Sequence, residues 1–167
     1  MIVNSSPLLP ALPLETKITL KSLQVANHLS EETVAFSADL YVDGKKAFHV
    51  SNRGNGGPNS YTPYVNVPTL FQLETWAQRK TGETFEALDL IVAQIADKME
   101  QEKMLKRSFK TQVLMIDGGK MFGWKLQKNN PNSLAAIKNQ IAKQYPSATV
   151  LNDMPIEQAA ELVLALP

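Results

Sequence analysis

The chain has 167 residues, of which 44% are hydrophobic, 20% are charged and none is cysteine. This length suits one compact domain, and the hydrophobic content is too high for an intrinsically disordered chain. Without cysteine there are no disulfides, thiolate metal ligands or cysteine nucleophiles, and two histidines are too few for a zinc site. No apolar run approaches the roughly 20 residues that cross a bilayer. We therefore expect a globular protein without a metal, a cofactor or a membrane partner.

The net charge of +1 hides an uneven distribution of charged residues along the chain. Residues 1–102 carry eight basic and twelve acidic side chains, whereas residues 103–143 carry nine basic side chains and one acidic one, Asp117. Such an asymmetry makes a cationic face that attracts anions when the fold keeps the basic side chains together. The alternative is an ordinary solvated surface, in which acidic side chains from elsewhere in the fold lie between the lysines.

Residues 1–16 are predicted to form an arm ahead of the folded domain. Pro7, Pro10 and Pro13 recur at every third position, which matches the three residues per turn of a polyproline II helix. A proline-rich ligand for a partner domain fits this spacing. Because the arm is so apolar, we favour an extended segment that packs on its own chain or on a neighbouring subunit, which would give a homo-oligomer.

The remainder of the chain, residues 17–167, is predicted to be a single α+β domain. Strands are expected over 17–25 and over 33–42, where apolar and polar residues alternate with the period of a half-buried strand. Asp43 and Gly44 then signal a hairpin.

The length of this hairpin loop follows from the side-chain pattern of its strands. A two-residue loop, Asp43-Gly44, would place Phe48 and Val50 on the face opposite the apolar residues of the first strand. A loop of three residues that begins at Val42 puts the large apolar groups on one face, and it needs a left-handed residue at Gly44. The pattern therefore favours the three-residue loop.

Helices are expected over 68–80 and over 84–106, and the second has apolar residues at the spacing of a helix core face. This expected core face consists of Phe85, Leu88, Val92, Ile95 and Met99. A second hairpin is predicted within 111–126, and two more helices follow it. We expect a small antiparallel sheet from the two β-hairpins, packed against the long central helix and the C-terminal helices.

The segment from Ser51 to Tyr61 has the composition of a binding loop. Its eleven residues include three glycines, three asparagines and an arginine. Glycine lets a ligand approach backbone N–H groups closely, and the forked cation of Arg53 suits a phosphate or a carboxylate. The candidate ligand-binding residues are Ser51, Asn52, Arg53, Gly54, Asn55, Gly56, Gly57, Asn59 and Tyr61. The alternative is a turn-rich connection with a structural role.

An enzyme reading centres on His49, which shares a strand face with Ser51 and lies across the hairpin from Asp39. A hydrolase of the Ser-His-Asp type needs a hydrogen bond between the serine and the histidine. Residues two apart on a strand lie about 7 Å from each other, which is beyond hydrogen-bond reach. We therefore favour a protein that is not an enzyme and keep the hydrolase as the weaker alternative.

Several stretches resemble a group of small uncharacterised accessory proteins that bacteriophages, prophages and plasmids carry. These stretches are SEET (30–33), FSADLYVDGK (36–45), SNRGNGG (51–57), KQYP (143–146) and VLNDMP (150–155). The resemblance spans about residues 17–165 and leaves the arm outside it. It implies a cytoplasmic accessory protein of a mobile element, in a bacterial host.

The leading functional hypothesis is therefore a non-enzymatic accessory protein that acts on a host pathway, such as defence. It would do so by binding a nucleotide-like small molecule or a host protein. The alternative is a nucleic-acid-binding accessory protein that uses the basic segment 103–143.

Overall fold

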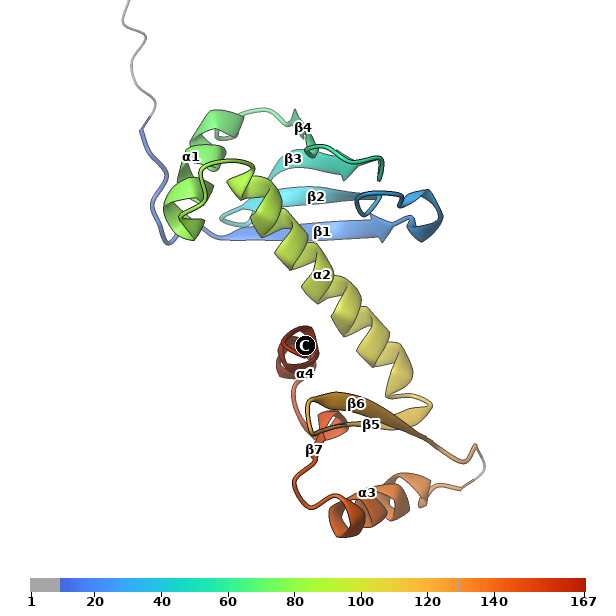
Figure 1. Ribbon diagram of the computed structural model, residues 1–167. Coiled ribbons are helices and arrows are strands. Elements are labelled where there is room, and N and C mark those ends of the chain that lie inside the picture. The colour runs from blue at the N-terminus through green and yellow to red at the C-terminus, as the bar shows by residue number, and fades with distance from the viewer. Residues whose placement is uncertain (1–9, 129) are drawn as a thin grey trace, which may run out of the picture. The chain divides into compact units, whose positions relative to one another are not determined.

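The computed structural model describes residues 10–128 and 130–167 (Figure 1). The chain divides into two compact units between Ala96 and Asp97, inside the longest helix, α2 (Ala87–Ser108). The model contains both helices and antiparallel sheets, which confirms the α+β class. That residues 17–167 fold as a single domain stays a prediction, and each unit is described separately below. No helix in the described ranges has the length and apolar character needed to span a membrane.

A four-stranded antiparallel sheet in the order β1-β2-β3-β4 forms the centre of the first unit (Figure 1). Its strands are β1 (Ile18–Val25), β2 (Phe36–Val42), β3 (Lys45–Asn52) and β4 (Ser60–Pro63), and the short helix η1 (Asn27–Leu29) follows β1. Alternate residues of β2 are buried, as its sequence pattern predicts. The buried side chains of this unit come from one face of the sheet, from α1 (Leu70–Thr81) and from the first turns of α2.

The β2–β3 hairpin differs from the predicted one in the length of its loop. Val42 pairs with Lys45, so the loop has two residues, and both Asp43 and Gly44 have positive φ angles, at 47° and 79°. The predicted three-residue loop is therefore wrong. The register shifts instead inside the strands, where a β-bulge between Leu40 and Tyr41 brings Leu40 opposite Phe48. The bulge restores the common apolar face that a two-residue loop alone would have lost.

The described part of the arm lies along α1, as one of the two predicted placements required. Side chains of α1 donate hydrogen bonds to the arm's backbone carbonyls, from Gln72 to Pro10 at 2.7 Å and from Arg79 to Leu12 at 3.1 Å. Pro7 of the proline repeat lies outside the described residues, and the homo-oligomer stays a prediction.

Helix α2 begins at Ala87, three residues later than predicted, because Glu86 has a positive φ of 50° that does not continue a helix. Phe85, the first residue of the predicted core face, is 86% exposed, whereas Leu88 and Val92 are fully buried. The carboxylate of Glu74 on α1 accepts hydrogen bonds from the backbone N–H groups of Ala87 and Leu88, at 2.9 and 3.2 Å. This carboxylate therefore caps the start of α2.

The second unit contains a three-stranded antiparallel sheet in the order β6-β5-β7. Its elements are β5 (Gln112–Asp117), β6 (Lys120–Lys125), α3 (Ser133–Gln144), β7 (Thr149–Val150), η2 (Leu151–Asp153) and α4 (Ile156–Leu164). One cluster of buried residues joins Leu105 of α2, Leu114 of β5 and Ala159 of α4, and a separate cluster joins Val113 and Met115 of β5 to Ile141 of α3. The strand β5 therefore has an apolar core on each face, and the two predicted hairpins lie in different sheets.

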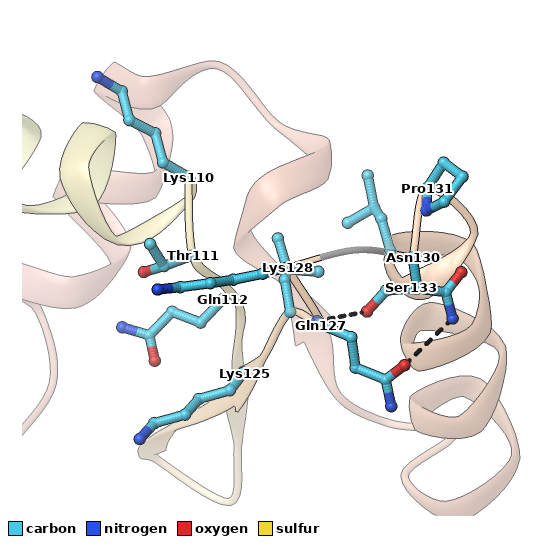
Figure 2. Close-up of a pocket in the computed structure, with 11 residues that line it drawn as sticks. Lys110, Thr111, Gln112, Lys125, Gln127, Lys128, Asn130, Pro131 and Ser133 are labelled. Atoms are coloured by element: carbon cyan, nitrogen blue, oxygen red, sulfur yellow. Dashed lines mark hydrogen bonds between the residues drawn. The ribbon is translucent and has the colours of Figure 1, made fainter.

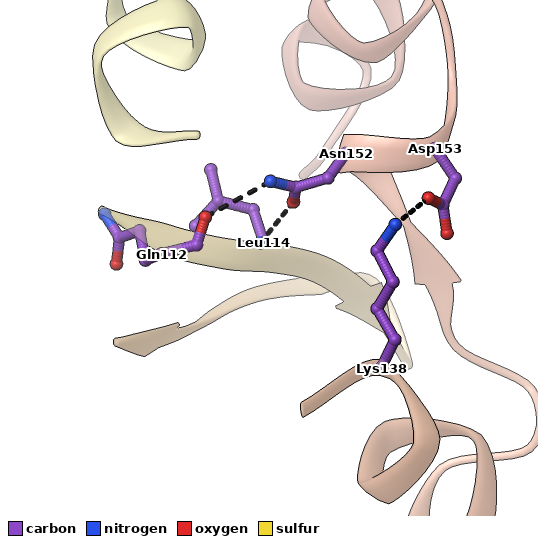
Figure 3. A network of polar contacts seen from close by, with 5 residues as sticks. All are labelled: Gln112, Leu114, Lys138, Asn152 and Asp153. Carbon is purple, nitrogen blue, oxygen red and sulfur yellow. Dashed lines mark hydrogen bonds and ion pairs between the residues drawn. The ribbon is translucent and has the colours of Figure 1, made fainter. Parts of the chain in front are cut away.

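Asn152 extends the hydrogen bonding of β5 beyond the short strand β7 (Figure 3). Its side-chain Oδ1 accepts from the backbone N–H of Leu114 at 2.8 Å, and its Nδ2 donates to the carbonyl of Gln112 at 3.2 Å. The amide side chain thus takes the place that a peptide group of a further paired strand would have. Beside it, Asp153 forms an ion pair with Lys138 of α3.

Candidate functional site

The glycine-rich segment after β3 folds back on the chain between β1 and β2. The carbonyl oxygen of Gly54 accepts hydrogen bonds from three consecutive backbone N–H groups, those of residues 31–33, at 2.9, 2.9 and 3.2 Å. Gly54 is buried, and its φ is 87°. A Cβ atom at this position would lie 2.3 Å from the carbonyl oxygen of Leu29. The close packing of backbone against backbone therefore requires glycine here.

Asn52 and Asn59 connect this segment internally, and Asp89 connects it to α2. The Asn52 side chain accepts from the N–H of Gly54 at 2.9 Å and donates to Oδ1 of Asn59 at 3.0 Å. The Asp89 carboxylate accepts from the N–H of Asn59 at 2.7 Å and from the hydroxyl of Tyr61 at 2.5 Å. Burial, together with this hydrogen bond to Asp89, raises the pKa of Tyr61 well above its usual range. The tyrosine therefore stays a neutral donor to the carboxylate.

Many of the polar groups that the sequence suggests for binding an anion form these contacts within the chain instead. The N–H of Gly54 donates to Asn52, and the N–H of Gly56 donates to Thr33 Oγ1 at 3.3 Å. Arg53, Asn55 and Gly57 are exposed to solvent. The geometry favours the structural interpretation of the segment, and its role in ligand binding stays a prediction.

The predicted Asp39–His49 pair is present on the open face of the first sheet. Asp39 is the centre of a polar cluster in which its carboxylate lies 3.0 Å from Lys46 Nζ and 3.6 Å from His49 Nδ1. The hydroxyl of Tyr64 donates to the same carboxylate at 3.2 Å. The hydrogen bond from Lys46 lowers the pKa of the Asp39 carboxyl, with smaller contributions from Tyr64 and His49. In the described parts of the chain no hydrogen bond joins Ser51 to His49, so the contact that a hydrolase needs is missing.

A cavity of about 450 Å³ opens in the second unit where the two strands of its hairpin separate (Figure 2). Three lysines, Lys110, Lys125 and Lys128, line it together with polar side chains that include Thr111, Gln112 and Gln127. Figure 2 shows the three ammonium groups on the side of the cavity away from Asn130 and Ser133. None of its described lining residues is acidic. The cavity is therefore cationic and able to make several hydrogen bonds.

Local hydrogen bonds fix the walls of this cavity. The backbone N–H of Leu126 donates to the carbonyl of Thr111 at 2.8 Å, which extends the pairing of β5 and β6 by one step. The N–H of Gln127 donates to the buried hydroxyl oxygen of Ser133 at 2.9 Å. The side-chain Nδ2 of Asn130 donates a hydrogen bond to Oε1 of Gln127 at 3.2 Å. Gln127 and Asn130 are thereby held close to the start of α3.

A second hollow, of about 380 Å³, lies on the last turns of α2 and shares Lys110 with the cavity. Its basic residues are Lys103, Lys106, Arg107 and Lys110, and one acidic residue, Glu102, lines it as well. Lys103, Lys106 and Arg107 are spaced by three and one residues, which places them on one side of the helix, and Lys110 lies in the turn just after the helix ends. Two of them have acidic neighbours, because Lys103 pairs with Glu100 at 2.8 Å and Lys106 lies 3.7 Å from Glu102.

The sequence pointed to the basic segment 103–143 but not to the cavity within it. Lys110 precedes β5, whereas Lys125 and Lys128 follow fifteen or more residues later, so only the hairpin brings them together. The same segment includes Lys138, which the fold directs to Asp153 instead. The second predicted hairpin could have indicated this cavity. At the open end of a hairpin, the residues before the first strand lie close to those after the second strand.

Comparisons of this chain with protein-family models, with curated proteins and with solved structures find no match. The resemblance to accessory proteins of bacteriophages and plasmids stays a prediction.

Proposed function

We propose that the protein is a non-enzymatic binding protein for a phosphate-bearing anion, and that the lysine-lined cavity of the second unit is its binding site. The observation that carries this proposal is that Lys110, Lys125 and Lys128 all line one cavity that has no acidic residue among its described lining. Like charges held together repel one another, and a bound anion relieves that repulsion. Ammonium groups also form charge-assisted hydrogen bonds with phosphate oxygens.

Binding rather than catalysis follows from the side chains that line the cavity. General acid–base chemistry most often employs histidine, aspartate or glutamate within hydrogen-bond reach of the reacting group, and lysine where burial lowers its pKa. Of the described residues that line this cavity, none is a histidine, aspartate or glutamate, and its three lysines are exposed. Threonine, glutamine, asparagine and serine supply hydrogen bonds that orient a ligand. With this proposal we keep the setting that the resemblance implies, an accessory protein of a mobile element that acts on a host pathway.

The test is calorimetric titration with inorganic pyrophosphate and with a nucleoside triphosphate, at low salt. We expect Lys125→Gln to weaken binding by about tenfold, which corresponds to roughly 1.4 kcal/mol and to the low end of a charge-assisted hydrogen bond. Lys120→Gln is the matched control, because Lys120 begins the same strand but does not line the cavity. Equal affinity in wild type and Lys125→Gln would contradict the proposed site.

Arg53→Ala separates this site from the glycine-rich segment. Arg53 is an exposed cation of the first unit, so its removal should leave the affinity for pyrophosphate unchanged. A large loss of affinity in Arg53→Ala, with none in Lys125→Gln, would return the function to the segment that the sequence first suggested.

A further inference from the structure

The cavity and the hollow on α2 form one basic surface, because Lys110 lines both. Six cations belong to this basic surface: Lys103, Lys106, Arg107, Lys110, Lys125 and Lys128. All six are exposed. They come from the end of α2, from the turn between α2 and β5, from the last residue of β6 and from the loop after it, all within the second unit. A single phosphate group cannot contact so many cations.

Four of the six cations have no acidic partner within the described ranges. Glu100 and Glu102 form the ion pairs with Lys103 and Lys106, while Arg107, Lys110, Lys125 and Lys128 have none there. Exposed pairs contribute little to stability, so Lys103 and Lys106 can exchange their partners for a ligand at small cost. The four free cations set the number of phosphates that the surface neutralises.

We infer that this basic surface binds a single strand of nucleic acid, with one nucleotide in the cavity and the following phosphates along α2. The inference rests on the proposed anion-binding function and names the ligand class of that site. A groove of positive charge that follows the backbone is the usual means of binding single strands without sequence preference. Concave sites suit a flexible strand, whose nucleotides can turn inward, better than the stiff rod of a duplex. Leu126, Pro131 and Leu134 add an apolar part of the wall for a base.

The test measures fluorescence anisotropy of labelled 12-nucleotide DNA and RNA strands, and of a duplex, over a range of salt concentrations. Each phosphate neutralised on a single strand contributes about −0.7 to the slope of log affinity against log salt, so four free cations give a slope of about −3. We expect single strands to bind more tightly than both the duplex and pyrophosphate.

Three variants separate the outcomes. Arg107→Gln changes the hollow on α2 alone, so it should make the slope less steep by about 0.7 and leave pyrophosphate binding unchanged. Lys125→Gln should weaken the binding of both pyrophosphate and the single strands, and Lys120→Gln should change the affinity for neither. All three positions are exposed, and circular dichroism checks that each variant is folded.

The inference would be overturned, while the proposed function stands, if pyrophosphate binds as tightly as the strands or if Arg107→Gln does not change the slope. A duplex that binds more tightly than single strands would also overturn it. Absence of binding by pyrophosphate and by all strands would overturn the proposed function as well.

Discussion

The glycine-rich segment after β3 packs its backbone closely against the chain ahead of β2. Two of its glycines provide a matched test of this close packing. Gly54 and Gly57 both have a φ of 87°. They differ in their surroundings, because a Cβ atom at Gly54 would lie 2.3 Å from the carbonyl oxygen of Leu29, whereas one at Gly57 would meet nothing within 4 Å. An alanine at either position therefore has the same unfavourable backbone conformation, but only the alanine at position 54 also has a steric clash.

The expected magnitudes follow from these two contributions. A residue with a Cβ costs about 1–2 kcal/mol in a left-handed conformation, and this applies to both variants. Overpacking in a well-packed site adds about 1–3 kcal/mol. We therefore expect Gly57→Ala to lower the free energy of unfolding by about 1–2 kcal/mol and Gly54→Ala by about 2–5 kcal/mol. The loss of unfolded-state freedom on replacing glycine is the same in both and cancels in the comparison.

Urea unfolding followed by circular dichroism gives the assay. The two variants should share the slope of the free energy against urea and differ in their midpoints, with Gly54→Ala unfolding first. If the midpoints coincide, the close approach of Gly54 to Leu29 does not exist in solution. The anchoring of the segment by the three N–H groups of residues 31–33 would then need another explanation.

Asn152→Ala removes both hydrogen bonds to β5 and should destabilise the protein by about 1–3 kcal/mol, the cost of leaving buried backbone groups unpaired; hydrogen exchange should show faster exchange at the amide of Leu114, and unchanged protection there would argue against the contact. For Asp39, a lowered carboxyl pKa stabilises the fold above the unfolded pKa, and this contribution disappears as pH falls through the folded value. The difference in unfolding free energy between wild type and Asp39→Asn should therefore shrink below about pH 4, and a constant difference down to pH 2 would exclude the pKa shift.

Periodicity predicted the elements better than their ends. The alternation over 33–42 identified β2, because a strand with one buried face must alternate. The predicted register of the β2–β3 hairpin is wrong because the register shifts within the strands and not in the loop. A β-bulge next to Tyr41 gave the same burial with a shorter loop, and a bulge has little sequence signal when no glycine marks it. Phe85 failed as a core residue because Glu86 interrupts the helix that would have positioned it.

The composition of the glycine-rich segment predicts the polar groups that it uses but not the groups that they meet in the fold. Backbone N–H groups, asparagine side chains and a tyrosine hydroxyl are all used, as a binding loop would use them. Their partners, however, are other parts of the same chain, with Thr33 and Asp89 taking the places that ligand oxygens would have. Composition cannot distinguish an internal acceptor from an external one, because the distinction depends on what the fold brings within about 3 Å.

The basic segment 103–143 contains no motif, yet it carries the functional proposal, because the fold decides which of its cations have an acidic neighbour. A lysine without an acidic neighbour is the most readily available to a ligand, whereas Lys103, Lys106 and Lys138 form ion pairs with acidic residues. The lysines at the open end of the β5–β6 hairpin form no ion pair with any residue that the structure describes, since polar uncharged and apolar residues line the cavity around them. Their charge is therefore available to an anion. The functional information in residues 103–143 lies in where acidic side chains are missing rather than in the number of basic ones.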